Sequence, residues 1–422
     1  MTHDDSAATD DIPRHDGGTT VDESISVSEI SDSASDPETA TEFIVGPDSN
    51  TRPVISVVMP TMNEKQGIET CIEQIEDAVV ELQVPTEIIV SDNSDDQTPD
   101  IARECGAIVV ESDTEGYGYA YRHGFEYARG EYIVMGDADT TYDFSQIPML
   151  LEHLQVEEAD IVIGSRFEGE IIPGAMPPLH QYVGNPMLTR FLNIFYDTNV
   201  TDAHSGFRVF RRDILNDLNL RTSGMEFASE MIMAASAQDL VIAEAPIVYY
   251  EREGEETLNS FQDGWRHVRF MLTNAPAYLF LIPGPSLGTF GLLVMFLAWS
   301  DITIGSVNLA VNSMIAGSLF TIVGYQIGSL GVFALATGNP IQHPNDPITN
   351  RITEALTPER GALIGLAAFS IGTLLSSAMI YQWILSGFAT LGSTKSAIFA
   401  FTLIVVGLQT VFSSFFLSII AD

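Results

Sequence analysis

The sequence predicts an α/β domain with a mostly parallel sheet, followed by an all-α transmembrane domain of four helices. From Thr51 to about Pro276, short apolar runs alternate with helical stretches, which is typical of a parallel sheet covered by helices on both faces. From Ala277 onward the chain is overwhelmingly apolar, and four stretches exceed the ~20 residues needed to cross a bilayer. These spans are expected at about 277–300, 309–337, 361–385 and 396–420, within a transmembrane domain of residues 277–422.

The first fifty residues predict a disordered acidic tail. They carry thirteen Asp or Glu, with Arg14 as the one arginine and Phe43 as the one aromatic residue. So little apolar surface cannot offset the entropy lost on ordering the chain. The segment also lacks the charged-then-apolar layout of a signal peptide. We therefore expect the folded domain to begin at about residue 51.

The expected elements of the α/β domain follow one another at short intervals. A continuous apolar strand at 54–59 stops at Pro60, and an amphipathic helix then runs to Leu82. Strands at 87–90 and 107–110 flank a helix that starts at Thr98-Pro99, a good N-cap followed by proline at the first helical position. A helix at 116–128, a strand at 132–135, a helix at about 145–154 and a strand at 161–163 continue the alternation.

Polar clusters follow three of these strands, at residues 60–64, 92–96 and 137–139. The carboxyl ends of parallel strands share one edge of a sheet, where ligands bind in this class of fold. In the last cluster, Asp137 and Asp139 form an Asp-x-Asp pair that suits a hard divalent cation gripping a diphosphate. A single Asp-x-Asp is also good turn chemistry, but three acidic clusters on one edge favour a binding site.

The charge is strongly acidic. The net charge is −39, and residues 51–276 contain 39 acidic against 14 basic residues. Lys65 and Lys395 are the two lysines of the whole chain. This balance favours a protein of a halophilic archaeon over an unusually acidic mesophilic protein, and it argues against nucleic-acid binding, which needs a basic surface. In about 1 M salt the Debye length is roughly 3 Å, so an anionic nucleotide is not repelled.

The region before the first span mixes Trp265, Arg266 and Arg269 with apolar residues. We expect residues 264–276 to form an amphipathic helix at the bilayer surface. Four spans return the chain to its starting side, and the loop at 338–360 carries Arg351 and Arg360. The sequence therefore predicts a multi-pass protein of the cell membrane whose catalytic domain and two termini are cytoplasmic. The two cysteines, Cys71 and Cys105, match no metal-binding pattern and are expected to be reduced and buried.

Seven blocks of the chain carry a recognisable pattern, at residues 58–64, 91–94, 137–139, 164–166, 202–208, 224–230 and 264–267. In this order they resemble the family 2 glycosyltransferases of the GT-A fold. More narrowly, they are similar to dolichyl-phosphate mannose and glucose synthases and their polyprenyl-phosphate relatives, here of a haloarchaeal type. The resemblance spans about Val54 to Phe270, so it implies a GT-A domain at residues 51–263.

The resemblance implies a role for each matching position. For the nucleotide sugar it implies Pro60, Met62, Glu64, Val90, Asp92, Asp137, Ala138, Asp139 and Thr141. Asp137 and Asp139 would hold Mg²⁺ or Mn²⁺, and the acceptor phosphate would meet Arg166, His180, Arg208 and Arg252. Asp139, Arg166 and Arg208 would be the catalytic residues.

The chain departs from the family pattern at several positions. Met62 stands where relatives often have Tyr, and Thr141 where they often have Gln or another polar group. His180 is followed by Gln181 rather than Arg, and Glu256-Thr257 replaces a frequent Ser-Lys pair. These changes weaken the expected phosphate contacts of the loop after Arg252, and they leave His180 as either a phosphate ligand or an ordinary loop residue.

The resemblance implies inverting transfer of a mannose or glucose from GDP-mannose or UDP-glucose to dolichyl or polyprenyl phosphate, for protein or cell-surface glycosylation. A phosphate is already an anion at neutral pH, so it needs no general base to attack. One alternative is a processive polysaccharide synthase, whose usual Gln-x-x-Arg-Trp appears here with Trp265 before Arg266. Another is a non-catalytic membrane protein for binding or lipid translocation, which the intact Asp137 and Asp139 disfavour.

Overall fold

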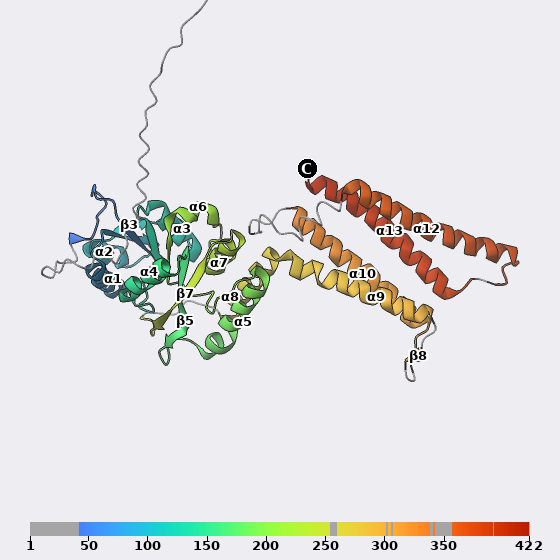
Figure 1. Cartoon of the computed structure of the whole chain (residues 1–422), viewed down its shortest axis with the longest axis horizontal. Coiled ribbons are helices and arrows are strands. Elements are labelled where there is room, and N and C mark those ends of the chain that lie inside the picture. The colour runs from blue at the N-terminus through green and yellow to red at the C-terminus, as the bar shows by residue number, and fades with distance from the viewer. Residues whose placement is uncertain are drawn as a thin grey trace, which may run out of the picture.

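The computed structural model describes residues 42–253, 260–300, 303–304, 307–337, 341, 357–390 and 392–421. Figure 1 shows an α/β domain followed by a set of long helices, with α8 (Ser260–Asn274) between them. The predicted fold class is therefore confirmed. Of the predicted acidic tail, residues 1–41 lie outside the described part of the chain.

The end of the predicted tail is part of the folded domain instead. Ile44 forms a parallel bridge with Thr86, and the Val45 amide donates to the Thr86 carbonyl at 2.8 Å. Val45 is buried, and Phe43 packs against the core. The expectation that ordered structure starts at residue 51 is wrong for residues 43–45, because three apolar residues in a row provide enough buried surface to extend the sheet.

The α/β domain contains a seven-stranded sheet with the order β3-β2-β1-β4-β6-β5-β7. Both pairings of β6 are antiparallel and the other pairings are parallel. The sequence pattern predicts neither β6 nor β7. The strands are β1 (Ile55–Thr61), β2 (Thr86–Asp92), β3 (Ile108–Glu111), β4 (Tyr132–Met135), β5 (Ile161–Ile171), β6 (Arg208–Arg211) and β7 (Ile242–Tyr249).

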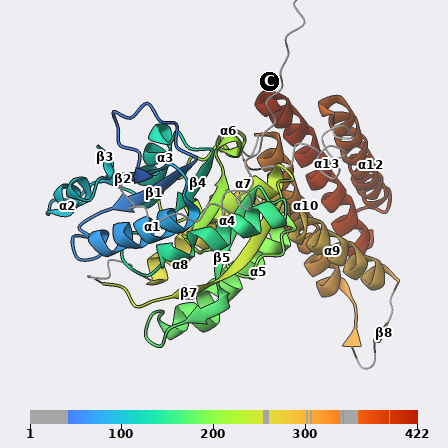
Figure 2. The ribbon, with the colours of Figure 1, turned by 60° about the vertical axis from the view of Figure 1, so that its left-hand side comes forward.

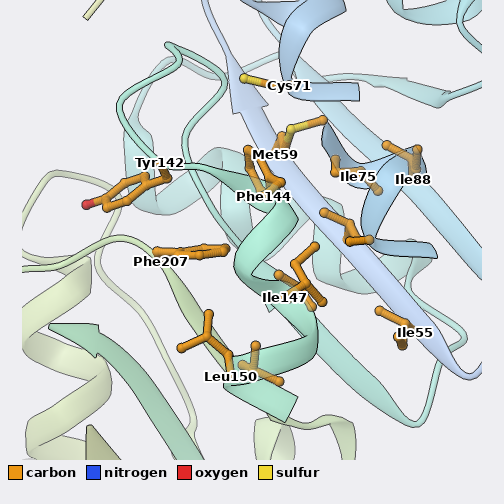
Figure 3. Packing of buried hydrophobic residues seen from close by; sticks show 14 of the residues in the cluster. Ile55, Met59, Cys71, Ile75, Ile88, Tyr142, Phe144, Ile147, Leu150 and Phe207 are labelled. Atoms are coloured by element: carbon orange, nitrogen blue, oxygen red, sulfur yellow. The ribbon is translucent and has the colours of Figure 1, made fainter. Parts of the chain in front are cut away.

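Helices cover both faces of the sheet, because the buried strands are apolar on both sides. Val57 and Met59 pack with α1 (Ile68–Leu82) and α4 (Ile147–Val156) on one face, as Figure 3 shows for Met59 and its neighbours. Val58 lies between them in sequence and packs into the other face. Helices on that face are α3 (Tyr117–Tyr127), α5 (Asn185–Tyr196) and α7 (Phe227–Ala237), while α2 (Thr98–Glu104) and α6 (Leu215–Leu218) are short.

Among the described residues, four helices are long and apolar enough to cross a membrane: Tyr278–Trp299, Val311–Ala336, Glu359–Leu385 and Thr394–Ile420. They correspond to α9 (Pro283–Trp299), α10 (Val311–Ala336), α12 (Pro358–Leu385) and α13 (Thr394–Ala421). Glycine permits close packing within each pair, since a Cβ on Gly291 would lie 2.5 Å from the Thr321 nitrogen of α10, and one on Gly407 would lie 2.4 Å from the Phe369 nitrogen of α12. Figure 2 shows the pairs α9–α10 and α12–α13 side by side, and Ser318 and Thr402 join them through hydroxyls 2.7 Å apart.

Candidate functional site

The loops that follow β1 and β2 are tied together at the carboxyl edge of the sheet. The Thr61 hydroxyl donates to Asp92 Oδ1 at 2.7 Å, and the Asn63 amide donates to Ser94 Oγ at 2.8 Å. Asn63 has a φ of 64°, a left-handed conformation that Asn tolerates better than most residues. Its side chain accepts a hydrogen bond from the Asp95 amide at 3.0 Å. The first two polar clusters therefore form one rigid wall.

Asp92 is a structural centre of this wall. Its carboxylate is buried and also accepts hydrogen bonds from the Ser94 hydroxyl at 2.6 Å and the Ser94 amide at 3.1 Å. These contacts hold the carboxylate in a fixed orientation at the sheet edge. The expected contact between Asp92 and the nucleoside stays a prediction.

Asp137 follows β4 at the same edge, beside aromatic hydroxyls. The Tyr121 hydroxyl donates to Asp137 Oδ1 at 3.0 Å. A Cβ on Gly206 would lie 2.9 Å from Asp137 Oδ2 and 2.8 Å from the Tyr117 hydroxyl, so this glycine leaves room for the carboxylate. Burial raises the pKa of Asp137 above its ordinary value, and the nearby Asp139 charge raises it further.

Asp139 is oriented by the two residues that follow it. Thr140 has a φ of 63°, which a β-branched residue rarely adopts, and its hydroxyl donates to the Asp139 carbonyl at 2.7 Å. This turn brings the Thr141 hydroxyl within 2.5 Å of Asp139 Oδ1, and the Thr141 amide lies 3.2 Å from the same oxygen. Thr141 is buried. Its hydroxyl thus positions Asp139, and the structure gives no support for Thr141 as a direct ligand of the donor.

Arg252 joins the first and third clusters. It lies in the segment after β7, where its Nη2 donates to Glu64 Oε1 and its Nη1 lies 3.5 Å from Asp139 Oδ2. Burial raises the pKa of Glu64, the Arg252 charge opposes that rise, and the Asp139 charge adds to it, giving a pKa of about 7. The structure thereby brings Glu64, Asp139 and Arg252 together, as expected for groups serving one ligand.

Arg166 is held by a partner that the sequence analysis did not assign. Its Nε and Nη2 donate to the two carboxylate oxygens of Asp202 at 2.6 and 2.7 Å, and both side chains are buried. The guanidinium carbon also lies 5.1 Å from the centre of the Tyr249 ring. The signal for this pair was present, because Asp202 opens the block that ends at Arg208. A phosphate contact of Arg166 stays a prediction.

Arg208, which was expected to contact the acceptor phosphate, lies in the interior of the domain. Its side chain is completely buried, and its three nitrogens donate to the carbonyls of Ser205 at 2.9 Å, Ala228 at 2.9 Å and Ala203 at 3.0 Å. These contacts fasten the segment 203–205 to α7. Direct contact between Arg208 and a lipid phosphate is therefore not supported, and we assign this residue to positioning of the loop that carries Gly206.

Other predicted nucleotide contacts also face the core. The side chain of Val90 is completely buried among core residues of the sheet, and Ala138 is 1% exposed in the same cluster. Neither side chain can reach a nucleotide, so only their backbone groups remain available for that role. Pro60 is half-buried near the end of β1, while Met62 is 57% exposed in the loop that follows β1.

His180 belongs to the segment between β5 and α5. It begins a single π-helical turn, His180–Gly184, directly before α5. Its amide donates to the Pro177 carbonyl at 2.9 Å. Among the contacts of the described residues, none joins His180 to Asp137, Asp139 or Glu64. A phosphate contact of His180 stays a prediction.

The carboxylates fit a divalent cation that a ligand helps to hold. Among the described residues, no group of three or more His, Cys, Asp or Glu is arranged to bind a metal by itself. Asp137 and Asp139 nevertheless offer hard oxygen donors of the kind that a divalent cation prefers. Burial, and after it the Asp139 charge, raises the pKa of Asp137, and a nearby cation would favour its charged form. Such a site would take its remaining oxygen ligands from a bound diphosphate and from water.

Both parts of the chain are similar to known proteins. Residues 56–218 match the model of glycosyl transferase family 2, and residues 332–421 match the family 2 C-terminal transmembrane region. The chain is 49% identical over 381 residues to the low-salt glycan biosynthesis hexosyltransferase Agl6 of Haloferax volcanii, covering 90% of this chain and 92% of that protein.

Two further relatives match mainly the α/β domain. A dolichyl-phosphate hexose transferase of Haloferax volcanii is 34% identical, covering 50% of this chain and 89% of that protein. An undecaprenyl-phosphate mannosyltransferase of Micrococcus luteus is 30% identical, covering 49% of this chain and 87% of that protein. With its mostly parallel sheet and the transmembrane region that follows, the chain belongs to glycosyl transferase family 2 and is a multi-pass membrane glycosyltransferase with a GT-A-like catalytic domain.

Proposed function

We propose that this protein transfers a hexose, mannose or glucose, from a nucleotide-diphospho-sugar to dolichyl or another polyprenyl phosphate. The observation that carries this proposal is a group of carboxylates, Asp137, Asp139 and Glu64, at the edge of the sheet in a domain that packs against the first candidate membrane span. The names of the relatives support both halves of it. Agl6 is described as a hexosyltransferase, and a second relative is described as a dolichyl-phosphate hexose transferase.

The donor half of the reaction rests on the edge of the sheet. Asp137 and Asp139 would hold Mg²⁺ or Mn²⁺, which would neutralise the charge of the leaving diphosphate. Glu64 and Asp92 belong to the wall against which the nucleoside would lie, with GDP-mannose and UDP-glucose as candidate donors. Arg252 contacts both Glu64 and Asp139, so its guanidinium is within reach of the same diphosphate.

The acceptor half rests on a surface suited to lipid. Although the domain is strongly acidic, residues 171–196 contain no Asp or Glu. This segment exposes the large apolar side chains of Leu179, Tyr182, Val183, Met187 and Ile194. An exposed apolar surface of this kind marks an interaction site. At its end, Phe195 packs against Tyr278, the first residue of the first span, with 4.7 Å between the ring centres.

The helix before the first span also contacts the site. On α8, Trp265 is 62% exposed, while His267 packs against His204 with 5.0 Å between ring centres. Ser229 of α7 lies 3.4 Å from His204 Nδ1 and 3.3 Å from His267 Nδ1. His204 belongs to the same loop as Gly206, which adjoins Asp137. The membrane-proximal helix is therefore connected through one loop to a proposed metal ligand.

This arrangement is suited to direct displacement at the sugar. The lipid phosphate would attack the anomeric carbon, so an α-linked nucleotide sugar would give a β-linked lipid product. The attacking group is an anion and needs no general base, which leaves positioning and charge stabilisation to the protein. Arg252 would meet the diphosphate, Arg166 would be kept in its orientation by Asp202, and Arg208 would hold the Gly206 loop.

The test is a transfer assay with membranes in multimolar KCl, containing added dolichyl phosphate and radiolabelled GDP-mannose or UDP-glucose. We expect label in a solvent-extractable lipid that mild acid releases, and none with the Asp139→Asn variant. Label in a polymer would instead indicate processive polysaccharide synthesis. Absence of label from both fractions with every nucleotide hexose tried would contradict the proposal. Protease protection of the catalytic domain in sealed vesicles would test its proposed cytoplasmic orientation.

A further inference from the structure

Arg252 is fastened to the segment that carries the proposed metal ligands. Besides the side-chain contacts with Glu64 and Asp139, the Glu253 amide donates to the Asp139 carbonyl at 3.2 Å. The Tyr250 amide donates to the Thr141 carbonyl at 2.9 Å. The guanidinium therefore lies where it does because the backbone on both sides of it is bonded to residues 139–141.

This placement engages both oxygens of Asp139. Thr141 donates to Oδ1, and the Arg252 guanidinium lies 3.5 Å from Oδ2. The side chains of Asp139 and Arg252 are 13% and 27% exposed, so water screens their attraction only in part. A divalent cation that binds Asp139 must share or displace one of these partners. The guanidinium and the metal consequently compete for one carboxylate.

Arg252 also has an unmet hydrogen-bond donor. Its Nε is buried and has no hydrogen-bond partner among the described residues. A buried N–H without an acceptor is costly, so the guanidinium is set to gain a partner when a suitable anion arrives. Phosphate oxygens match the planar arrangement of the guanidinium N–H groups. Glu64 and Asp139, which lie on different loops, contact only the two terminal nitrogens, Nη2 and Nη1.

We propose that Arg252 is an internal counter-cation that exchanges partners during donor binding. Without a donor it neutralises Glu64 and Asp139; when the metal and the nucleotide diphosphate bind, it leaves Asp139 and takes the diphosphate. This inference rests on the proposed donor class. It has a specific consequence: the metal alone binds weakly, because it must displace the guanidinium, whereas the metal and nucleotide bind together well.

The exchange predicts effects of opposite sign from one substitution. In Arg252→Gln, Mn²⁺ alone should bind about three to ten times more tightly, as expected for removal of a competing, partly buried ion pair. Mn²⁺ in the presence of UDP or GDP should bind less tightly than in the wild type by a similar factor, because the diphosphate loses a charged partner. Arg252→Lys keeps the charge and should bind Mn²⁺ alone much as the wild type does.

The experiment is a titration in which Mn²⁺ is added to the full-length protein in detergent at one fixed KCl concentration. Electron paramagnetic resonance monitors the binding of Mn²⁺. Titrations are run without nucleotide, with UDP and with GDP. Arg103→Gln is the matched control, because Arg103 forms an exposed ion pair with Asp100 at 3.3 Å on α2. It should leave every Mn²⁺ affinity unchanged. Thermal unfolding of each variant checks that the fold is intact.

Opposite shifts in the two kinds of titration support the exchange. Equal or weaker binding of Mn²⁺ alone by Arg252→Gln overturns it, since Arg252 would then only support the site. Shifts of the same sign with and without nucleotide overturn it too, as does a failure of the wild type to bind Mn²⁺ under any of these conditions. Because no sugar transfer is measured, opposite shifts in a protein that transfers no hexose to lipid would uphold the exchange and reject the proposed acceptor.

Discussion

Replacement of Gly206 by alanine tests how closely the protein is packed around Asp137. The added Cβ would lie 2.9 Å from Asp137 Oδ2 and 2.8 Å from the Tyr117 hydroxyl, about 0.5 Å short of the 3.4 Å at which ordinary contact begins. Gly206 does not have a positive φ, so alanine fits the backbone and the effect is steric. The Gly206 amide itself donates a hydrogen bond to the Tyr142 hydroxyl at 2.7 Å, which limits how far the loop can retreat.

The size of the effect follows from that displacement. A misplacement of about 1 Å in a catalytic site costs about 100-fold in rate, so a shift of half that size should lower kcat/KM for sugar transfer by about tenfold. Overpacking should also lower the free energy of unfolding by about 1–3 kcal/mol. The loss should fall mainly on kcat/KM, because the altered contact is with the carboxylate proposed to hold the metal.

The assay is the lipid-extraction assay at several donor concentrations, with thermal unfolding measured in parallel. Gly46→Ala is the control, because nothing lies within 4 Å of a Cβ built there. It should match the wild type in both measurements. A Gly206→Ala protein with a kcat/KM within twofold of the wild type would refute the reasoning, as it would show that the position of Asp137 does not limit transfer.

Three further substitutions separate the roles of individual residues. Asp139→Asn should reduce transfer at least 100-fold while thermal unfolding stays near that of the wild type, because it removes charge at the donor and no core contact. Asp202→Asn should lower the free energy of unfolding by roughly 3–5 kcal/mol, since it breaks a buried pair with Arg166. Burial raises the pKa of Asp202, but the attraction to Arg166 outweighs this effect and lowers the pKa below its ordinary value of 3.8. The pair therefore stabilises the protein above about pH 4, and this stabilisation is lost as the pH falls through the folded-state pKa of Asp202. Unfolding measured as a function of pH should show this loss in the wild type and not in the variant. Val90→Ala should cost about 2 kcal/mol of stability in thermal unfolding and leave the donor KM unchanged, because Val90 is a core residue.

The parallel strands were predictable because their apolar residues in the sequence are the residues that the folded sheet buries. The runs ending at Thr61, Asp92 and Met135 carry buried apolar residues on both faces of the sheet, although Ser56 and Glu87 are buried polar residues within them. The strand β6 was not predictable in this way, because Arg208 at its start is a charged residue. Only the surrounding carbonyls of loop 203–205 and α7 make its burial possible.

Some residues of the candidate site could likewise be predicted from the sequence, and others could not. Asp137, Asp139, Glu64 and Asp92 could be grouped from the sequence, because residues that follow parallel strands meet at one sheet edge. Partners from distant parts of the chain could not be identified from spacing. Asp202 is 36 residues from Arg166, and Arg252 is 188 residues from Glu64. These pairs depend on how loops from β5, β6 and β7 come together.

By itself, the sequence determined the order of the elements from β1 to β5, the four apolar helices and the acidic edge of the sheet, because each follows from local periodicity and composition. The tertiary structure alone decided which charged groups are free for ligands and which are already used. Arg208 donates to backbone carbonyls and Arg166 is oriented by Asp202, while Arg252 faces the carboxylates of the site. The physical reason is that burying a guanidinium is costly without hydrogen-bond acceptors, and which acceptors lie beside it depends on the folded chain.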